Sequence, residues 1–251
     1  VIMLAALLTG LSIPAYAAPS DLTRISVDSS GAQANGTSYR GQLSADGRYV
    51  AFASGAPNLV AGDTNNVEDI FVKDRQTGAT IRVSLASLTG AQANGESGGT
   101  LGISSDGRYV AFESNATNLV ASDTNGQRDV FVRDLQLGVT TLVSVDSAGL
   151  QANDISKNVS ISGDGRVVTF TSPATNLVSG DTNNAGDIFV HDRQTGRTTR
   201  ASVASNGSEA NAGSRYPNLS SDGRYVTFSS SATNLVAGDT NGKADVFVRD
   251  L

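Results

Sequence analysis

Apolar residues in this chain occur in short runs or alternate with polar residues, as they do in β-strands. The run 49–54 reads Tyr-Val-Ala-Phe-Ala-Ser, and the run 69–74 reads Asp-Ile-Phe-Val-Lys-Asp. Segments of this length that are rich in β-branched and aromatic residues predict strands, and Gly, Asn and Asp between them predict turns. No stretch has the 3.6-residue period of an amphipathic helix. The pattern therefore predicts an all-β fold.

This pattern recurs four times at a nearly constant period. A segment of the form Ser-x-Asp-Gly-Arg, followed by a strand ending in Phe-x-Ser, occurs at 44–54, 104–114, 162–172 and 220–230. The Asp-Gly pair predicts a tight hairpin, because glycine adopts a positive φ without steric cost. Self-similarity at a fixed period indicates a repeat architecture.

Each repeat contains four predicted strands. In the first repeat, one strand ends at Leu43, and the others span 49–54, 69–74 and 80–87. Four short strands per unit are typical of a β-propeller blade, whose sheet is buried only when neighbouring blades stack on it. We therefore predict a β-propeller of four-stranded antiparallel blades over 22–251, with repeats centred on 46–54, 106–114, 164–172 and 222–230.

The two ends of the array allow two arrangements. Residues 23–29 resemble the fourth strand of a repeat, and the last repeat reaches only its third strand at Leu251. In one arrangement, the N-terminal strand completes the last blade and closes a four-bladed ring. In the other, the chain is a fragment of a larger ring or array. Both remain open from the sequence.

Charge and the N-terminal segment indicate where such a protein works. The net charge is −6, and no basic patch is visible, which argues against a nucleic-acid partner. Residues 1–17 are mostly apolar and end in Ala15-Tyr16-Ala17, which predicts a signal peptide. The apolar run is too short to span a bilayer. We expect a secreted or periplasmic protein without a membrane span in the mature chain, and without disulfides because cysteine is absent.

The loop between the second and third strands repeats the pattern Asp-x-Asn-x-x-x-Asp. Its members are Asp63, Asn65, Asp69, Asp123, Asn125, Asp129, Asp181, Asn183, Asp187, Asp239, Asn241 and Asp245. Oxygen ligands at positions 1, 3 and 7 resemble the start of a calcium loop, and they predict Ca²⁺ binding. The alternative is that these residues form Asx turns. Position 6 is not glycine, and Asp74 at position 12 lies beyond a strand.

Strand alternation places these loops at the same end of the blades as four Gln/Glu-Ala-Asn loops, at 33–35, 92–94, 151–153 and 209–211. We expect this loop face to bind a protein or glycan ligand. At the opposite end, we expect Arg48 to pair with the aspartate that ends the third strand. Phe52 and Phe71 should lie in the core, and His191 is expected to be an isolated surface histidine.

The two repeated strand motifs together resemble the WD40-like propeller repeat of the TolB-type (PD40) family. The motifs are Ser-x-Asp-Gly-Arg-Tyr-Val-Ala-Phe and Asp-Val-Phe-Val-Arg-Asp, and the resemblance covers everything after residue 22. It implies a propeller, most often six-bladed, in exported bacterial proteins. Four repeats differ from that number, and the Asp-Thr-Asn loop is longer than the corresponding connection in the family.

Catalysis needs unlike groups that converge on one point, whereas most carboxylates here follow the repeat. The departures, Glu68, Glu113 and the pair Arg215–Tyr216, lie in different repeats, and we predict no acid–base pair among them. The chain is therefore interpreted as a non-catalytic binding or scaffold module. The alternatives are a carbohydrate- or peptide-processing propeller enzyme with its site on the central axis, and a structural surface array.

Overall fold

A computed structural model describes residues 22–251, so the predicted signal peptide at 1–17 lies outside the described residues.

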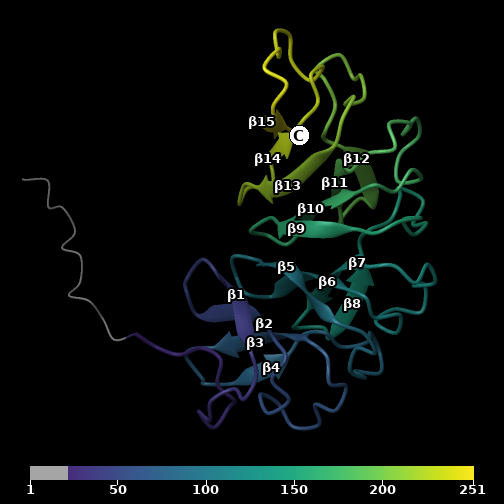
Figure 1. The fold of residues 1–251 in the computed structure, drawn as a ribbon. Helices are drawn as coiled ribbons and strands as arrows, with labels where there is room; N and C mark the ends of the chain where they lie inside the picture. The colour runs from purple at the N-terminus through teal and green to yellow at the C-terminus, as the bar shows by residue number, and fades with distance from the viewer. Residues whose placement is uncertain (1–21) are drawn as a thin grey trace, which may run out of the picture.

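The chain folds into four consecutive antiparallel sheets, arranged as blades around a common axis (Figure 1). Blade 1 consists of β1 (Ser38–Leu43), β2 (Tyr49–Ser54), β3 (Asp69–Asp74) and β4 (Thr80–Arg82). Blade 2 consists of β5 (Ser97–Ile103), β6 (Tyr109–Ser114), β7 (Asp129–Asp134) and β8 (Val139–Leu142). Blade 3 consists of β9 (Lys157–Ile161), β10 (Val167–Ser172), β11 (Asp187–Asp192) and β12 (Arg197–Arg200). Blade 4 consists of β13 (Ser214–Leu219), β14 (Tyr225–Ser230) and β15 (Asp245–Asp250). The predicted all-β propeller is confirmed.

The second and third strands form the centre of each blade. In blade 1 they pair without interruption from Tyr49 opposite Asp74 to Ser54 opposite Asp69. Phe52 lies opposite Phe71, with ring centroids 5.8 Å apart, and the same pair recurs in each blade. Both rings in blade 1 are almost fully buried, so the predicted core role of these phenylalanines is confirmed.

Hydrophobic cores lie between neighbouring blades as well as within them. Ile70 and Val72 of blade 1 belong to one buried cluster with Leu101 and Phe112 of blade 2. Corresponding clusters join blades 2 and 3, and blades 3 and 4. Each sheet therefore depends on its neighbour for burial, as expected for a repeat fold.

The Asp-Gly-Arg turn joins the first two strands of each blade. Asp46 accepts hydrogen bonds from the Ser44 hydroxyl and from the Arg48 amide, while Gly47 adopts a φ of 69°. Arg48 then pairs with Asp74 at 2.8 Å, and the same ion pair recurs in the other three blades. The predicted pairing is confirmed.

The fourth strand is shorter than predicted. We expected it to span 80–87, but β4 ends at Arg82, and Leu85 forms only an isolated bridge to Gln92. The reason is that the chain leaves its own sheet to contact the next blade, where Thr140 donates a hydrogen bond to the Leu85 carbonyl at 2.6 Å.

The N-terminal segment follows the same geometry, so the predicted strand at 23–29 is wrong. Val27 forms only an isolated bridge to Gln33. Its carbonyl accepts a hydrogen bond from Thr80 at 2.6 Å, and the Asp28 carbonyl accepts one from Lys73 at 2.9 Å. These contacts place the segment against blade 1. Among the described residues β15 pairs only with β14, so the segment does not complete blade 4 as the closed-ring arrangement required.

His191 is buried, not on the surface as expected. Its side chain is 6% exposed, and Nδ1 lies 2.9 Å from the Thr198 hydroxyl. Lys73 and Arg133 occupy the same place in blades 1 and 2, where each donates to the corresponding threonine. The blade-to-blade packing buries this position in blades 1 to 3.

Blade 4 differs from the others in having one uncovered face. Val246 and Val248 of β15 are 77% and 67% exposed, whereas their counterparts Ile188 and Val190 in blade 3 are buried under blade 4.

Within residues 22–251, no helix has the length and hydropathy needed to cross a membrane.

Candidate functional site

In blade 1, an arginine lies between the two aspartates of the predicted calcium loop. Arg82 Nη2 is 3.1 Å from Asp63, and Nε is 3.6 Å from Asp69. Asp69 also accepts hydrogen bonds from Asn65 and from the Ser84 hydroxyl. The side chains of Arg82, Asp63 and Asp69 are almost fully buried. A guanidinium therefore neutralises the carboxylates where a metal ion was expected.

Blade 3 is built in the same way and has one more carboxylate. Arg200 Nη1 is 3.3 Å from both Asp181 and Asp187, and 2.5 Å from Glu209. One oxygen from each of the three carboxylates lies within 4.8 Å of the other two. Burial and the nearby Asp187 charge raise the pKa of Asp181 to about 6. Although burial opposes it, hydrogen bonds from Thr182 and Arg200 lower the pKa of Glu209 to about 2.

Blade 2 has the same two aspartates with a different partner. Gln151 Nε2 donates to Asp123 Oδ1 and to Asp129 Oδ2, each at 2.9 Å. Burial raises the pKa of Asp129 to about 6. In blade 4, Asn241 donates to Asp245 at 3.1 Å, and one oxygen of Asp239 is buried without a partner among the described residues.

The asparagines of the four loops turn their oxygens away from the aspartate pairs. Each side-chain oxygen accepts a hydrogen bond from the amide two residues ahead, as Asn125 does from Gln127 at 2.7 Å. The same bond occurs at Asn65, Asn183 and Asn241. These are Asx turns, which fix the loop backbone. The structure thus brings together the first and last aspartates of the loops in blades 1 to 3, and assigns the asparagines to the turn.

The Gln/Glu-Ala-Asn loops lie against the acidic loops, as predicted from strand alternation. Gln92 bonds to Thr64 in blade 1, while the amide of Asn94 donates to Asn118 of blade 2 at 3.0 Å. The alanine between them, Ala93, is buried. The loops at 92–94, 151–153 and 209–211 therefore each join the loop ends of two neighbouring blades, while the loop at 33–35 contacts Asn58 of blade 1.

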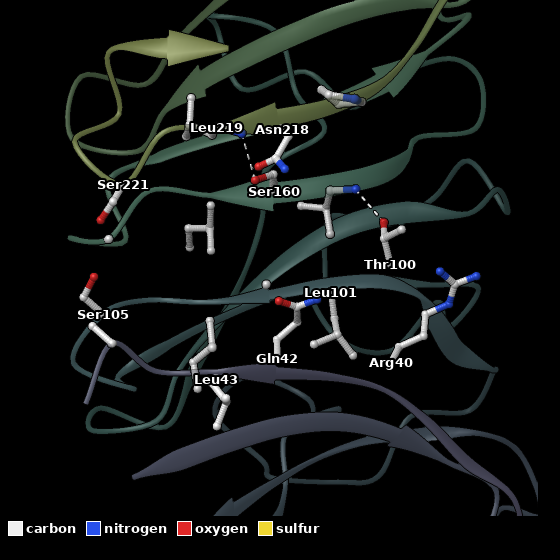
Figure 2. Close-up of a pocket in the computed structure, with 17 residues that line it drawn as sticks. Arg40, Gln42, Leu43, Thr100, Leu101, Ser105, Ser160, Asn218, Leu219 and Ser221 are labelled. Atoms are coloured by element: carbon white, nitrogen blue, oxygen red, sulfur yellow. Dashed lines mark hydrogen bonds between the residues drawn. The ribbon is translucent and has the colours of Figure 1, made fainter. Parts of the chain in front are cut away.

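A cavity of about 560 Å³ is lined by the first strands of all four blades, which lie side by side in chain order (Figure 2). Its polar lining includes Arg40 and Gln42 of β1, Thr100 of β5, Ser160 of β9 and Asn218 of β13. Two hydrogen bonds across its wall join neighbouring blades, from the Val159 amide to Thr100 and from the Leu219 amide to Ser160. This axial cavity is not visible in the sequence, because its residues are separated by about one repeat each.

At one end of the axial cavity, main-chain hydrogen bonds link the turns of successive blades. The Ala45 amide donates to the Ser105 carbonyl, the Ser105 amide to Gly163, and the Gly163 amide to Ser221, at 2.7–3.0 Å. The apolar side chains Leu43, Ile103, Ile161 and Leu219 lie next to this end. The cavity therefore has a row of apolar side chains between the turn serines Ser105 and Ser221 and the more polar residues along the strands.

Each first strand contains a bulge with a residue at positive φ. These residues are Arg40, Gly99, Asn158 and Tyr216, with φ of 57°, 76°, 57° and 58°. A non-glycine residue in this conformation stores backbone strain, which accumulates at functional sites more than elsewhere. In the sequence, only the unusual Arg215–Tyr216 pair pointed to this position.

Charged groups that break the repeat gather at the bulge of β5. An added Cβ at Gly98 would lie 2.7 Å from Glu68 Oε2 and 3.6 Å from Glu96 Oε1. The Tyr39 hydroxyl donates to Glu68, and burial together with this bond raises the pKa of Tyr39 to about 12. Glu113 accepts hydrogen bonds from Thr100 and, across the blade boundary, from the Asn158 amide at 2.8 Å. The sequence does not indicate that Glu68 and Glu113 lie near one another, because they belong to different repeats and meet only when neighbouring blades stack.

No family model matches the chain, and no curated protein sequence matches it. Among solved structures, TolB from Acinetobacter baumannii is 17% identical with a TM-score of 0.49, over 86% of this chain and 41% of that chain. A putative TolB from Agrobacterium tumefaciens is 18% identical with a TM-score of 0.48, over 87% and 62% of the two chains. A prolyl endopeptidase is 12% identical with a TM-score of 0.51, over 86% and 28%. The chain thus spans less than two thirds of the length of each. Together with the four stacked sheets, the likeness to the prolyl endopeptidase identifies the fold as a β-propeller.

Proposed function

We propose that this chain is the binding or scaffold module of an exported, TolB-type β-propeller protein, and that it holds an extended peptide segment of a partner protein in the axial cavity. The observation that carries the proposal is the lining of this cavity by one edge strand from each of the four blades. The export is supported by the signal-like sequence at 1–17, and the TolB type by the repeat motifs.

Edge strands suit peptide recognition, because their outer backbone groups are not used within their own sheet. β1, β5, β9 and β13 are each the first strand of their sheet. The amide side chains of Gln42 and Asn218 offer both donors and acceptors beside these edges. A polar peptide backbone can therefore bond along the strands, while an apolar side chain occupies the end near Leu43 and Leu219. The volume of about 560 Å³ lies within the range of small-ligand sites.

Panning a phage-displayed library of random linear peptides against the purified protein tests this proposal. We expect the recovered peptides to lose about tenfold or more of their affinity when Gln42→Trp and Asn218→Trp fill the cavity. The matched control is Ile81→Trp, on the exposed side of the outer strand β4. Peptides whose affinity is unchanged by the cavity substitutions, or equally reduced by the control, contradict the axial site.

A peptide- or carbohydrate-processing enzyme is the second candidate, and the cluster at the β5 bulge favours it. Glu68 and Glu96 approach Gly98 from two blades, and the Tyr39 hydroxyl beside them donates a hydrogen bond to Glu68. Two carboxylates near one point are the basic requirement for acid–base hydrolysis. Turnover of nitrophenyl glycosides or peptide anilides that is abolished by Glu68→Gln favours this candidate over the binding module.

A further inference from the structure

The repeats differ in how they neutralise the aspartate pair of the acidic loop. β3, β7 and β11 each pair with the last strand of their blade, and the residue opposite the core phenylalanine is Arg82, Leu142 or Arg200. In blades 1 and 3, the arginine reaches both aspartates of its loop. Leu142 provides no charge, so blade 2 lacks the internal cation of its neighbours.

The two carboxylates of blade 2 are nevertheless buried. Asp123 is 6% exposed, and Asp129 is fully buried. Within residues 22–251, neither carboxylate forms an ion pair, and Asp123 Oδ2 is buried without a hydrogen-bond partner. A buried carboxylate oxygen without a donor is costly, and Asp123 Oδ2 is such an oxygen, whereas Asp129 accepts hydrogen bonds from Ser144 and Gln151. Two neighbouring buried carboxylates favour a bound positive charge between them.

The neighbouring glutamine shows how the site responds to the charge at its centre. In blade 1, Gln92 turns its oxygen toward the guanidinium of Arg82, at 2.7 Å from Nη1. In blade 2, Gln151 turns its nitrogen toward the two carboxylates instead. Rotating this amide by half a turn presents a third oxygen to a cation between Asp123 and Asp129, and it exchanges the hydrogen bond that the Thr124 amide now donates to the Gln151 oxygen at 2.9 Å for that metal contact.

We propose that Asp123, Asp129 and Gln151 bind one Ca²⁺ ion at the place that an arginine guanidinium occupies in blades 1 and 3. Calcium takes six to eight oxygen ligands in flexible geometry, so two carboxylates and an amide oxygen supply part of its shell and water completes it. The ion neutralises the pair and satisfies Asp123 Oδ2. This site is independent of the proposed peptide site, because its side chains belong to the loop end of blade 2.

The other three blades are poorer sites for physical reasons. In blades 1 and 3, a cation has to displace a guanidinium that already contacts both aspartates. Blade 4 has Asp239 and Asp245, but the described residues contain no counterpart of Gln151 beside them. The expected stoichiometry is therefore one ion per chain.

Calorimetric titration of the chelator-treated protein with CaCl₂ tests the site, together with the melting temperature Tm at constant ionic strength. We expect one binding event with a Kd of about 0.1–1 mM, as in extracellular calcium modules. At 10-fold excess over Kd, Tm should rise by about 3–6 °C. Leu142→Arg supplies the internal cation, so it should abolish the heat of binding and raise Tm without calcium. Thr141→Arg adds the same charge at the neighbouring position of β8 and should leave binding intact.

The reciprocal variant Arg82→Leu recreates the blade 2 arrangement in blade 1, so the stoichiometry should rise from one to two. A wild-type protein that gives neither heat nor a Tm shift overturns the proposal, as does binding that persists in both Leu142→Arg and Asp123→Asn. A Tm that responds to NaCl but not to CaCl₂ overturns it in favour of a monovalent ion. A Tm that rises on acidification without any effect of calcium overturns it in favour of a shared proton.

Discussion

The two ends of the blades are built on opposite principles. At the turn end, the Asp-Gly-Arg turn and its ion pair to the third strand have the same geometry in all four blades, with N–O distances of 2.7–2.8 Å. At the loop end, the aspartate pair faces Arg82 in blade 1, Gln151 in blade 2 and Arg200 in blade 3. The uniform end fixes register and blade spacing. The variable end is where individual blades acquire properties of their own.

Removing the internal cation of blade 3 should lower the free energy of unfolding more than any other substitution at either end of the blades. Arg200→Leu leaves Asp181, Asp187 and Glu209 without their shared partner. Breaking a buried ion pair from one side costs about 3–5 kcal/mol, so the free energy of unfolding in urea should fall by about that amount. Arg197→Leu, an exposed position on the same strand, is the control and should change it little. A similar loss in both variants would show that the cluster is not responsible.

Substituting the glycine of an Asp-Gly-Arg turn should cause a smaller loss of stability, and the size of the loss should depend on which residues pack against that turn. Gly107 has a φ of 76°, and an added Cβ would lie 2.1 Å from the Tyr49 ring of the preceding blade. Gly47 occupies the same turn position in blade 1, but its nearest atom is Arg75 Nη1 at 3.7 Å. Gly107→Ala should cost about 3 kcal/mol, and Gly47→Ala about 1 kcal/mol, since only the first adds a clash to the backbone strain. Equal losses in chemical denaturation would mean that blade stacking does not constrain the turn.

Acid should weaken the loop end of blade 3 through Glu209. Its pKa is lowered to about 2 in the folded protein, below the ordinary value of 4.5. The stabilisation is therefore present above about pH 4.5 and is lost as the pH falls toward 2. Glu209→Gln, which restores the residue type of Gln92 and Gln151, should remove about 1–2 kcal/mol of this pH dependence. Identical acid unfolding curves for the variant and the wild type would contradict the assignment.

The exposed ion pairs of the turn end should contribute least to the free energy of unfolding. Arg166 and Asp192 are 46% and 22% exposed in their side chains. A solvent-exposed pair contributes about 0–1 kcal/mol, so Arg166→Ala should lower the free energy of unfolding by less than about 1 kcal/mol. A loss as large as that of Arg200→Leu would remove the distinction between the two ends.

Local features were predictable from the sequence wherever neighbouring residues decide the structure. The strands 49–54 and 69–74, the hairpin at Asp46–Gly47 and the pairing of Arg48 with Asp74 follow from a strand pattern and a turn signal within one repeat. The length of β4 was not predictable, because a carbonyl five residues past the start of that strand bonds to the next blade. His191 was misjudged for the same reason, since packing between blades buries it.

The candidate sites likewise depend in part on local sequence and in part on the packing of blades. The sequence by itself determined which residues carry the acidic loops, and strand alternation placed the Gln/Glu-Ala-Asn loops beside them. Only the tertiary structure decided that Arg82 and Arg200 fill two of those loops while Leu142 leaves a third without a cation. The axial cavity and the cluster at the β5 bulge likewise exist only after stacking. The physical reason is distance along the chain: strand pattern and turn chemistry act over a few residues, whereas these sites join side chains from different strands and blades.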